Sequence, residues 1–112
     1  MNFLMNIFKN NKYKNIDSSE LKSIIKDNKS YIIIDVRTNQ EYKNGHIDKA
    51  KNIPVSELRN KVNTISKYKD KIVILYCASG ARSKSAASIL YKEGFENIYN
   101  LKGGMYSYMN SN

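Results

Sequence analysis

The sequence has few of the residues that form disulfide bonds or structural metal sites in small proteins. Its 112 residues include one cysteine, one histidine, one proline and no tryptophan. One cysteine forms no internal disulfide, and one cysteine with one histidine falls short of the four nitrogen or sulfur ligands of a structural zinc site. We therefore expect no metal, no cofactor and a reducing compartment, the cytoplasm.

Long hydrophobic runs are absent at the N-terminus. The chain begins MNFLMNIFKNNKYK, where the apolar part, residues 3–8, is interrupted by Asn6 and follows no basic residue. A signal peptide needs a basic start and a longer apolar region, and a spanning helix needs about 20 apolar residues. We expect residues 1–15 to form an N-terminal segment that packs on the domain, in preference to a membrane-surface contact.

Acidic residues are few relative to basic ones. Ten Asp and Glu stand against 19 Lys and Arg, a net charge of +9. This balance favours anionic partners, whether a small anion, an acidic protein or nucleic acid. The lysines are scattered among asparagines, however, and no basic motif interleaved with aromatic residues is present. The pattern indicates a solvated surface, so we expect neither nucleic acid nor a membrane as partner.

The hydrophobic content, 41%, is enough for one core in a chain of this length. We therefore treat residues 1–112 as a single domain with its core at about 16–110. β-branched or apolar runs predict strands at 31–35, 50–53, 71–76 and 97–101. Helical periodicity, with caps such as Asp17 and Gly45, predicts helices from residue 18, at 38–44, 56–65 and 83–92, and near 105.

Strands that alternate with helices at this spacing predict an α/β fold. We expect a central, mostly parallel sheet with helices on both faces, with KIVILY (71–76) as the central strand because it is the most continuous apolar run. The helix at 56–65 should bury one face and the helix at 83–92 another. The expected buried residues are Leu58, Val62, Ile65, Ala86, Ala87, Leu90 and Tyr91.

The lone cysteine, Cys77, stands at the end of the expected central strand. In an open α/β sheet the reactive groups gather outside the carboxyl ends of the strands. The loop CASGAR leads from Cys77 into the next helix, whose unpaired N–H groups and dipole favour negative charge. Gly80 allows the loop to curl its amides inward, and Arg82 adds a cation. Cys77 is therefore predicted to be a low-pKa nucleophile and not an inert core residue.

Three stretches of the chain together resemble the single-domain rhodaneses, sulfurtransferases that carry sulfur as a cysteine persulfide. IIDVRTNQEYKNGHIDKAKNIP (33–54) is similar to the family's first signature. YCASGARS (76–83) is similar to its active loop, and LKGGMYSY (101–108) to its closing segment. The match covers about residues 31–108 and implies a rhodanese-like fold.

The spacing in the active loop separates two chemistries. Four residues, Ala78, Ser79, Gly80 and Ala81, stand between Cys77 and Arg82. Tyrosine-phosphatase-like enzymes use five, which gives a wider cradle for tetrahedral phosphate. A tighter ring suits one sulfane sulfur, so phosphatase or arsenate reductase activity is disfavoured.

The resemblance implies a double displacement. Cys77 takes sulfur from thiosulfate or a persulfide donor and passes it to a thiophilic acceptor, with the loop amides stabilising the persulfide. Two alternatives stay open: a protein-to-protein relay with little thiosulfate activity, and a non-catalytic interaction module. The expected partners are a small anionic sulfur donor and donor or acceptor proteins.

The remaining polar residues are expected to be structural. Asp35, Arg37 and Glu41 should form an ion and hydrogen-bond set at the end of the 31–35 strand, and the resemblance places His46 in a structural turn. Tyr106 and Tyr108 are expected to pack at the core or its edge. Three departures from the family pattern are Asp48-Lys49 in place of Pro-Gly, Tyr108 near a frequent Trp, and no Lys or Arg at 78–81.

Overall fold

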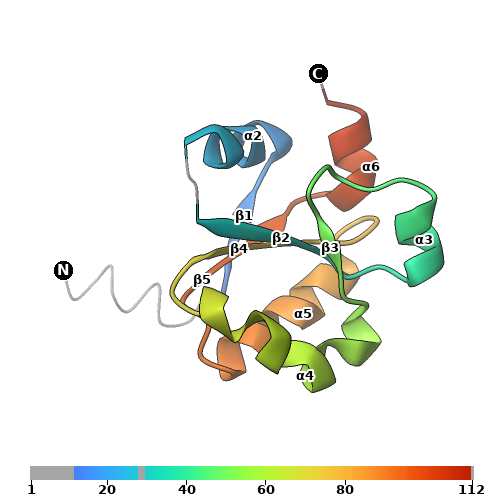
Figure 1. Ribbon diagram of the computed structural model, residues 1–112. Coiled ribbons are helices and arrows are strands. Elements are labelled where there is room, and N and C mark those ends of the chain that lie inside the picture. Colours follow the sequence, from blue (N-terminus) through green and yellow to red (C-terminus); the bar gives the residue numbers. More distant parts are fainter. Residues whose placement is uncertain (1–11, 28–29, 112) are drawn as a thin grey trace.

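Figure 1 shows the computed structural model, which describes residues 12–27 and 30–111. Five strands alternate with helices along the chain. The strands are β1 (Lys14–Ile16), β2 (Tyr31–Asp35), β3 (Lys51–Asn52), β4 (Ile72–Tyr76) and β5 (Asn97–Leu101). The helices are α2 (Ser18–Asp27), α3 (Asn39–Lys43), α4 (Leu58–Lys61), α5 (Ala81–Lys92) and α6 (Gly104–Met109), and 3-10 turns at Val55–Glu57 and Val62–Tyr68 flank α4.

The strands form one sheet in the order β1-β5-β4-β2-β3, and every pairing is parallel. The apolar run IVILY of β4 occupies the centre, as predicted. In a parallel sheet all the strands end at the same edge, and here that edge carries Cys77, directly after β4. The α/β class and the parallel sheet are confirmed.

Two apolar layers cover the two faces of the sheet, with α2 and α6 on one side and α4 and α5 on the other (Figure 1). Because successive strand residues point to opposite faces, Ile33 and Ile74 face the α2 and α6 layer, while Ile34 and Val73 face the α4 and α5 layer. All four side chains are fully buried. Helices on both faces are therefore confirmed.

Strand β1 is absent from the sequence-based prediction. Its three residues are KNI, too short and too polar to show strand periodicity. They join the sheet through backbone pairing with β5, Lys14 opposite Tyr99. The sheet thus begins at Lys14, and the expected packing of residues 1–11 lies outside the described residues.

Three further predictions need correction. Helix α5 begins at Ala81 and not at Ser83, since Gly80 with φ 120° acts as its N-cap. Tyr91 on this helix is 43% exposed and does not face inward. Tyr106 on α6 is 74% exposed, whereas Tyr108 packs against the α2 layer. Tyr91 was assigned from helical spacing, which does not locate the edge of a buried face.

No helix within residues 12–27 and 30–111 is long and apolar enough to cross a membrane.

The expected helix at 56–65 is present as α4 between its two 3-10 turns, and Leu58, Val62 and Ile65 are buried as predicted. The two-residue β3 is shorter than the 50–53 strand expected from the sequence. Pro54 follows β3 two residues later, and it cannot donate the backbone hydrogen bond that would continue the strand.

Candidate active site

Cys77 directly follows the carboxyl end of β4, and its side chain is 1% exposed. The loop after it turns at Gly80, whose φ of 120° is a backbone conformation that residues with a side chain rarely adopt. This turn directs the Gly80 N–H to the Cys77 Sγ at a donor–acceptor distance of 3.0 Å. The Ser83 Oγ, on the first turn of α5, lies 3.5 Å from the same sulfur.

The surroundings of Cys77 favour the thiolate. Burial alone raises the pKa of this thiol, but the Ser83 hydroxyl and the backbone N–H groups of Ser83, Gly80 and Ser79 outweigh it, so the pKa lies below its ordinary value. The net direction matches the low pKa predicted from the sequence. Hydrogen bonds from the loop and helix start carry the effect, as expected of an amide cradle around an anion.

Helix α6 supports the loop from behind. The N–H of Met105 donates to the Cys77 carbonyl at 2.8 Å, and that of Tyr106 donates to the Ala78 carbonyl at 3.1 Å. Gly104 packs so closely here that a Cβ would overlap the Cys77 carbonyl oxygen. The glycine pair of the closing LKGG segment thus lets α6 approach the backbone of the cysteine loop.

Arg82 forms a two-point ion pair with Glu41 of α3. The Nη1–Oε1 distance is 2.7 Å and the Nη2–Oε2 distance is 3.0 Å. The bond from Arg82, with help from Thr38 and against a smaller effect of burial, lowers the pKa of Glu41 to about 2. We expected Glu41 to belong with Asp35 and Arg37; it pairs with Arg82 instead, and so joins α3 to the start of α5.

Asp35 and Arg37 form a buried ion pair at the end of β2, with 2.7 Å between Arg37 Nη2 and Asp35 Oδ2. Arg37 also donates to the Gly45 carbonyl, and the Tyr76 hydroxyl donates to Asp35. The Tyr76 oxygen in turn accepts from the Ile47 N–H. This set ties the 45–47 turn to β2 and β4, a structural arrangement.

His46 is exposed and stacks on Tyr42, with ring centroids 3.7 Å apart. Its Nδ1 lies 2.9 Å from the Tyr42 carbonyl oxygen, and the Tyr42 hydroxyl donates to the Ala50 carbonyl. The histidine is thereby held in the turn that the sequence resemblance implies. Its contacts give it no part in activating Cys77.

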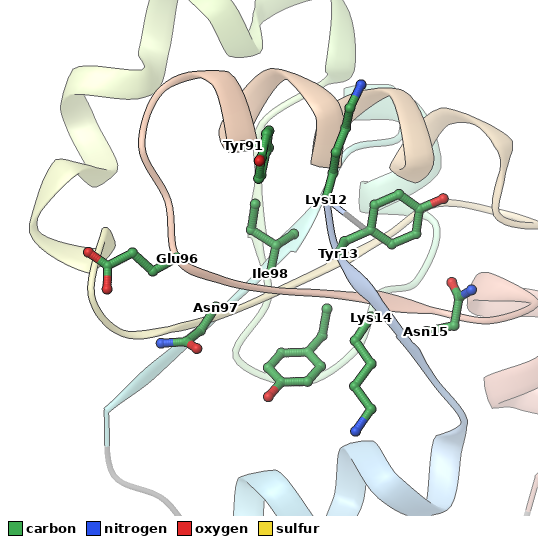
Figure 2. Close-up of a pocket in the computed structure, with 9 residues that line it drawn as sticks. Lys12, Tyr13, Lys14, Asn15, Tyr91, Glu96, Asn97 and Ile98 are labelled. Carbon is green, nitrogen blue, oxygen red and sulfur yellow. The ribbon is translucent and has the colours of Figure 1, made fainter. Parts of the chain in front are cut away.

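A separate hollow of about 600 Å³ lies beside β1, β5 and α5 (Figure 2). Within the described chain, its lining residues are Lys12, Tyr13, Lys14, Asn15, Tyr91, Glu96, Asn97, Ile98 and Tyr99. None belongs to the Cys77 loop.

Among the described residues, no group of three His, Cys, Asp or Glu side chains is placed to hold a metal ion.

Two residues at the site have no counterpart in the residues predicted from the sequence. Ser83 was expected only as a helix start, yet its hydroxyl contacts the Cys77 sulfur. Asn100 of β5 is 1% exposed and accepts a hydrogen bond from Ser83. A polar residue inside the apolar strand NIYNL is the one signal that could have indicated Asn100.

The fold and site define an α/β domain with a buried cysteine in a backbone cradle at the carboxyl edge of a parallel sheet. The family model of the rhodanese-like domain matches residues 17–111. The chain therefore belongs to the rhodanese-like family of sulfurtransferases that its sequence resembles.

Similar proteins agree with this assignment. A crystal structure of a rhodanese-related protein from Thermoplasma volcanium superposes with a TM-score of 0.76 at 36% identity, covering 87% of this chain and 91% of that one. The uncharacterized protein YqhL of Bacillus subtilis is 50% identical over 72 residues, 64% of this chain and 56% of that protein. A tRNA uridine(34) hydroxylase of Buchnera aphidicola is 37% identical over 87 residues, 74% of this chain. This chain spans 28% of that hydroxylase, so it resembles one part of a longer protein.

Proposed function

We propose that this protein moves sulfane sulfur from thiosulfate or a persulfide donor to a thiophilic acceptor through a persulfide on Cys77. The observation that carries the proposal is the contact between the Gly80 N–H and the Cys77 sulfur, at 3.0 Å, in a loop where the thiol pKa is lowered. A preformed thiolate attacks without a general base. The reducing cytoplasm is the compartment we propose, since a lone reactive thiol persists there.

In the first step the Cys77 thiolate attacks the sulfane sulfur of the donor. A new sulfur–sulfur bond forms at Cys77, and the bond within the donor breaks, with its electron pair leaving on sulfite when the donor is thiosulfate. In the second step an acceptor nucleophile attacks the outer sulfur of the persulfide. The bond to Cys77 breaks and the thiolate is regenerated, so no external oxidant or reductant is needed.

The loop amides supply the electrostatic part of the mechanism. The terminal sulfur of a persulfide is anionic, and N–H groups fixed by the Gly80 turn and the start of α5 hold negative charge there without reorganisation. Small side chains at Ala78, Ser79 and Ala81 leave room for the extra sulfur atom. Four intervening residues make a ring suited to one atom and not to a phosphate group.

A second candidate, protein-to-protein sulfur relay with little thiosulfate activity, is favoured by the Arg82–Glu41 pair. Both charges of this pair are about one third exposed, and Glu41 occupies both outer nitrogens of the guanidinium. Residues 78–81 contain no cation. The loop therefore offers little positive charge to a donor. A dianionic donor such as thiosulfate depends on that charge more than a singly charged donor does.

Steady-state turnover with cyanide as acceptor tests the proposal and separates its two forms. The rates with thiosulfate and with a low-molecular-weight persulfide are compared, and Cys77→Ser is the control in both. Turnover with either donor that disappears in Cys77→Ser supports sulfur transfer. A clear preference for the persulfide supports the relay form, and absence of turnover with both donors contradicts the proposal.

A further inference from the structure

A chain of polar side chains runs from the edge of the sheet to the nucleophile. The Asn15 Oδ1 on β1 accepts from the Asn100 Nδ2 at 3.0 Å, and the Asn100 Oδ1 accepts from the Ser83 hydroxyl. Ser83 in turn lies 3.5 Å from the Cys77 sulfur. Asn15 and Asn100 are register partners in the β1–β5 pairing, which brings their side chains to the same face.

When Cys77 is a neutral thiol, every hydrogen bond in this row of polar side chains has a donor and an acceptor. The Cys77 S–H donates to the Ser83 Oγ. The Ser83 hydroxyl donates its one hydrogen to the Asn100 Oδ1 or to the Gly80 carbonyl. The Gly80 carbonyl also accepts from the Lys84 N–H at 3.3 Å, so it does not depend on Ser83. Every member then has a partner.

Ionisation of Cys77 disturbs this arrangement. A thiolate donates nothing and instead needs a hydrogen from Ser83. If the serine turned its only hydrogen to the sulfur, its oxygen would face the Asn100 carbonyl oxygen with no hydrogen between them. An unsatisfied pair of this kind is costly in a buried site.

We propose that Asn100 is a positioning residue for the Cys77 thiolate. When the thiol ionises, the Asn100 amide turns over and donates its Nδ2 hydrogen to Ser83, which then donates its hydroxyl hydrogen to the sulfur. The two ends of an amide have the same shape, so the turn needs no extra room. Asn15, exposed at the edge strand, turns likewise and donates to the Asn100 oxygen. The Cys77 proton leaves to solvent, and no other proton is gained or lost.

This inference deepens the proposed function by naming what supports the nucleophile, but it requires only that Cys77 ionises. The charged groups around the loop are Arg82 of α5, paired with Glu41 of α3, and the Asp35–Arg37 pair at the end of β2. Variants of Asn100 leave all four charges in place. A change in Cys77 ionisation on substitution of Asn100 therefore reports on the amide itself.

The test is the pH profile of Cys77 alkylation by iodoacetamide, which measures the thiolate without any sulfur donor. Asn100→Leu removes the amide at nearly constant volume. We expect the midpoint to move to higher pH and the rate near neutral pH to fall roughly threefold to tenfold, the worth of one hydrogen bond. Asn97→Leu, an exposed position on the same strand, is the matched control and should leave the profile unchanged.

The sign of the shift decides the question. If Asn100 only accepts from Ser83, its removal frees the serine hydrogen for the thiolate and moves the midpoint to lower pH. A lower or an unchanged midpoint overturns the inference. In a Ser83→Ala background Asn100→Leu should have no further effect, because Asn100 acts through Ser83; an additive effect also overturns it. Sulfur transfer itself can succeed or fail independently of these results.

A measurement on the unmodified protein covers the case in which Asn100→Leu does not fold. The side-chain N–H resonances of Asn100 are followed by NMR while pH is raised through the ionisation of Cys77. We expect them to shift with the same midpoint as iodoacetamide reactivity, and the shift to vanish in Cys77→Ala. Resonances that do not move with Cys77 ionisation contradict the turn of the amide.

Discussion

Glu41 and Arg82 are 41 positions apart in the sequence and form a two-point ion pair across the mouth of the cysteine loop. Glu41 also caps α3 by accepting from the Thr38 N–H, so one carboxylate fixes both the helix and the arginine. The pair makes Arg82 a brace for the loop first and a source of positive potential second. This division of roles leads directly to a prediction about donor choice.

Glu41→Gln should increase the use of thiosulfate. The amide keeps the N3 position of the capping box but removes the negative charge that neutralises Arg82. We expect kcat/KM with thiosulfate to rise roughly threefold to tenfold, because a freed guanidinium can bond to the donor's charged oxygens. Turnover with a low-molecular-weight persulfide should change by less than about twofold.

Glu57→Gln is the matched control, since Glu57 forms a more exposed ion pair with Lys61 away from the loop. It should leave both donors unaffected. A fall in thiosulfate turnover in Glu41→Gln would mean that the brace, and not the free charge, limits the reaction.

The ion pair also predicts a pH dependence of stability. Because the pKa of Glu41 is about 2 in the folded chain and 4.5 is its ordinary value, the carboxylate stabilises the fold fully above the ordinary value. That stabilisation is lost as pH falls through the folded value. The difference in Tm between the unmodified protein and Glu41→Gln should therefore shrink between pH 4.5 and about 2. Thermal melts of the two proteins across this range measure it, and a constant difference would refute the assignment.

Gly104→Ala should displace the cysteine loop. Its Cβ would overlap the carbonyl oxygens of Cys77 and Ala78, and φ is 58°. Gly94→Ala is the matched control, because φ is also positive there, at 93°, but nothing lies within 4 Å of the new atom. We expect Gly104→Ala to lose more free energy of unfolding than Gly94→Ala by at least about 1 kcal/mol. Urea unfolding compares them, and equal losses would show that the close approach of α6 does not matter.

Lys49→Gly should stabilise the protein. Lys49 is the one residue other than glycine with positive φ, 70°, within residues 12–27 and 30–111. Its side chain is exposed. Relief of the left-handed strain should raise the free energy of unfolding by about 0.5–1 kcal/mol. Lys51→Gly, in β3, should instead lower it; a loss of stability in Lys49→Gly would contradict the assigned strain.

Periodicity and turn residues were sufficient to predict most of the fold. The strands at 31–35 and 97–101 match β2 and β5 to the residue, because each is a β-branched or apolar run bounded by polar residues. β1 was missed because its three residues are held by backbone pairing with β5, which leaves no side-chain signal. Tyr91 was misplaced because helical spacing predicts a face but not where burial ends.

The loop around Cys77 could be predicted because its chemistry is local. Cys77, the Gly80 turn and the start of α5 are contiguous in sequence, so the amide cradle follows from turn and helix geometry. The partner of Arg82 could not be predicted in the same way, because Glu41 approaches from α3 through the tertiary fold. Asn100 likewise meets Ser83 only when β5 and α5 are packed together.

Mass spectrometry of the intact protein after incubation with a sulfur donor tests sulfur transfer through Cys77 most directly. The unmodified protein should gain the mass of one sulfur atom, cyanide should remove it, and peptide mapping should place it on Cys77. Cys77→Ser, with the fold retained, should gain nothing. If Cys77→Ser carries the extra sulfur as well as the unmodified protein does, the thiol in the amide cradle is not the carrier.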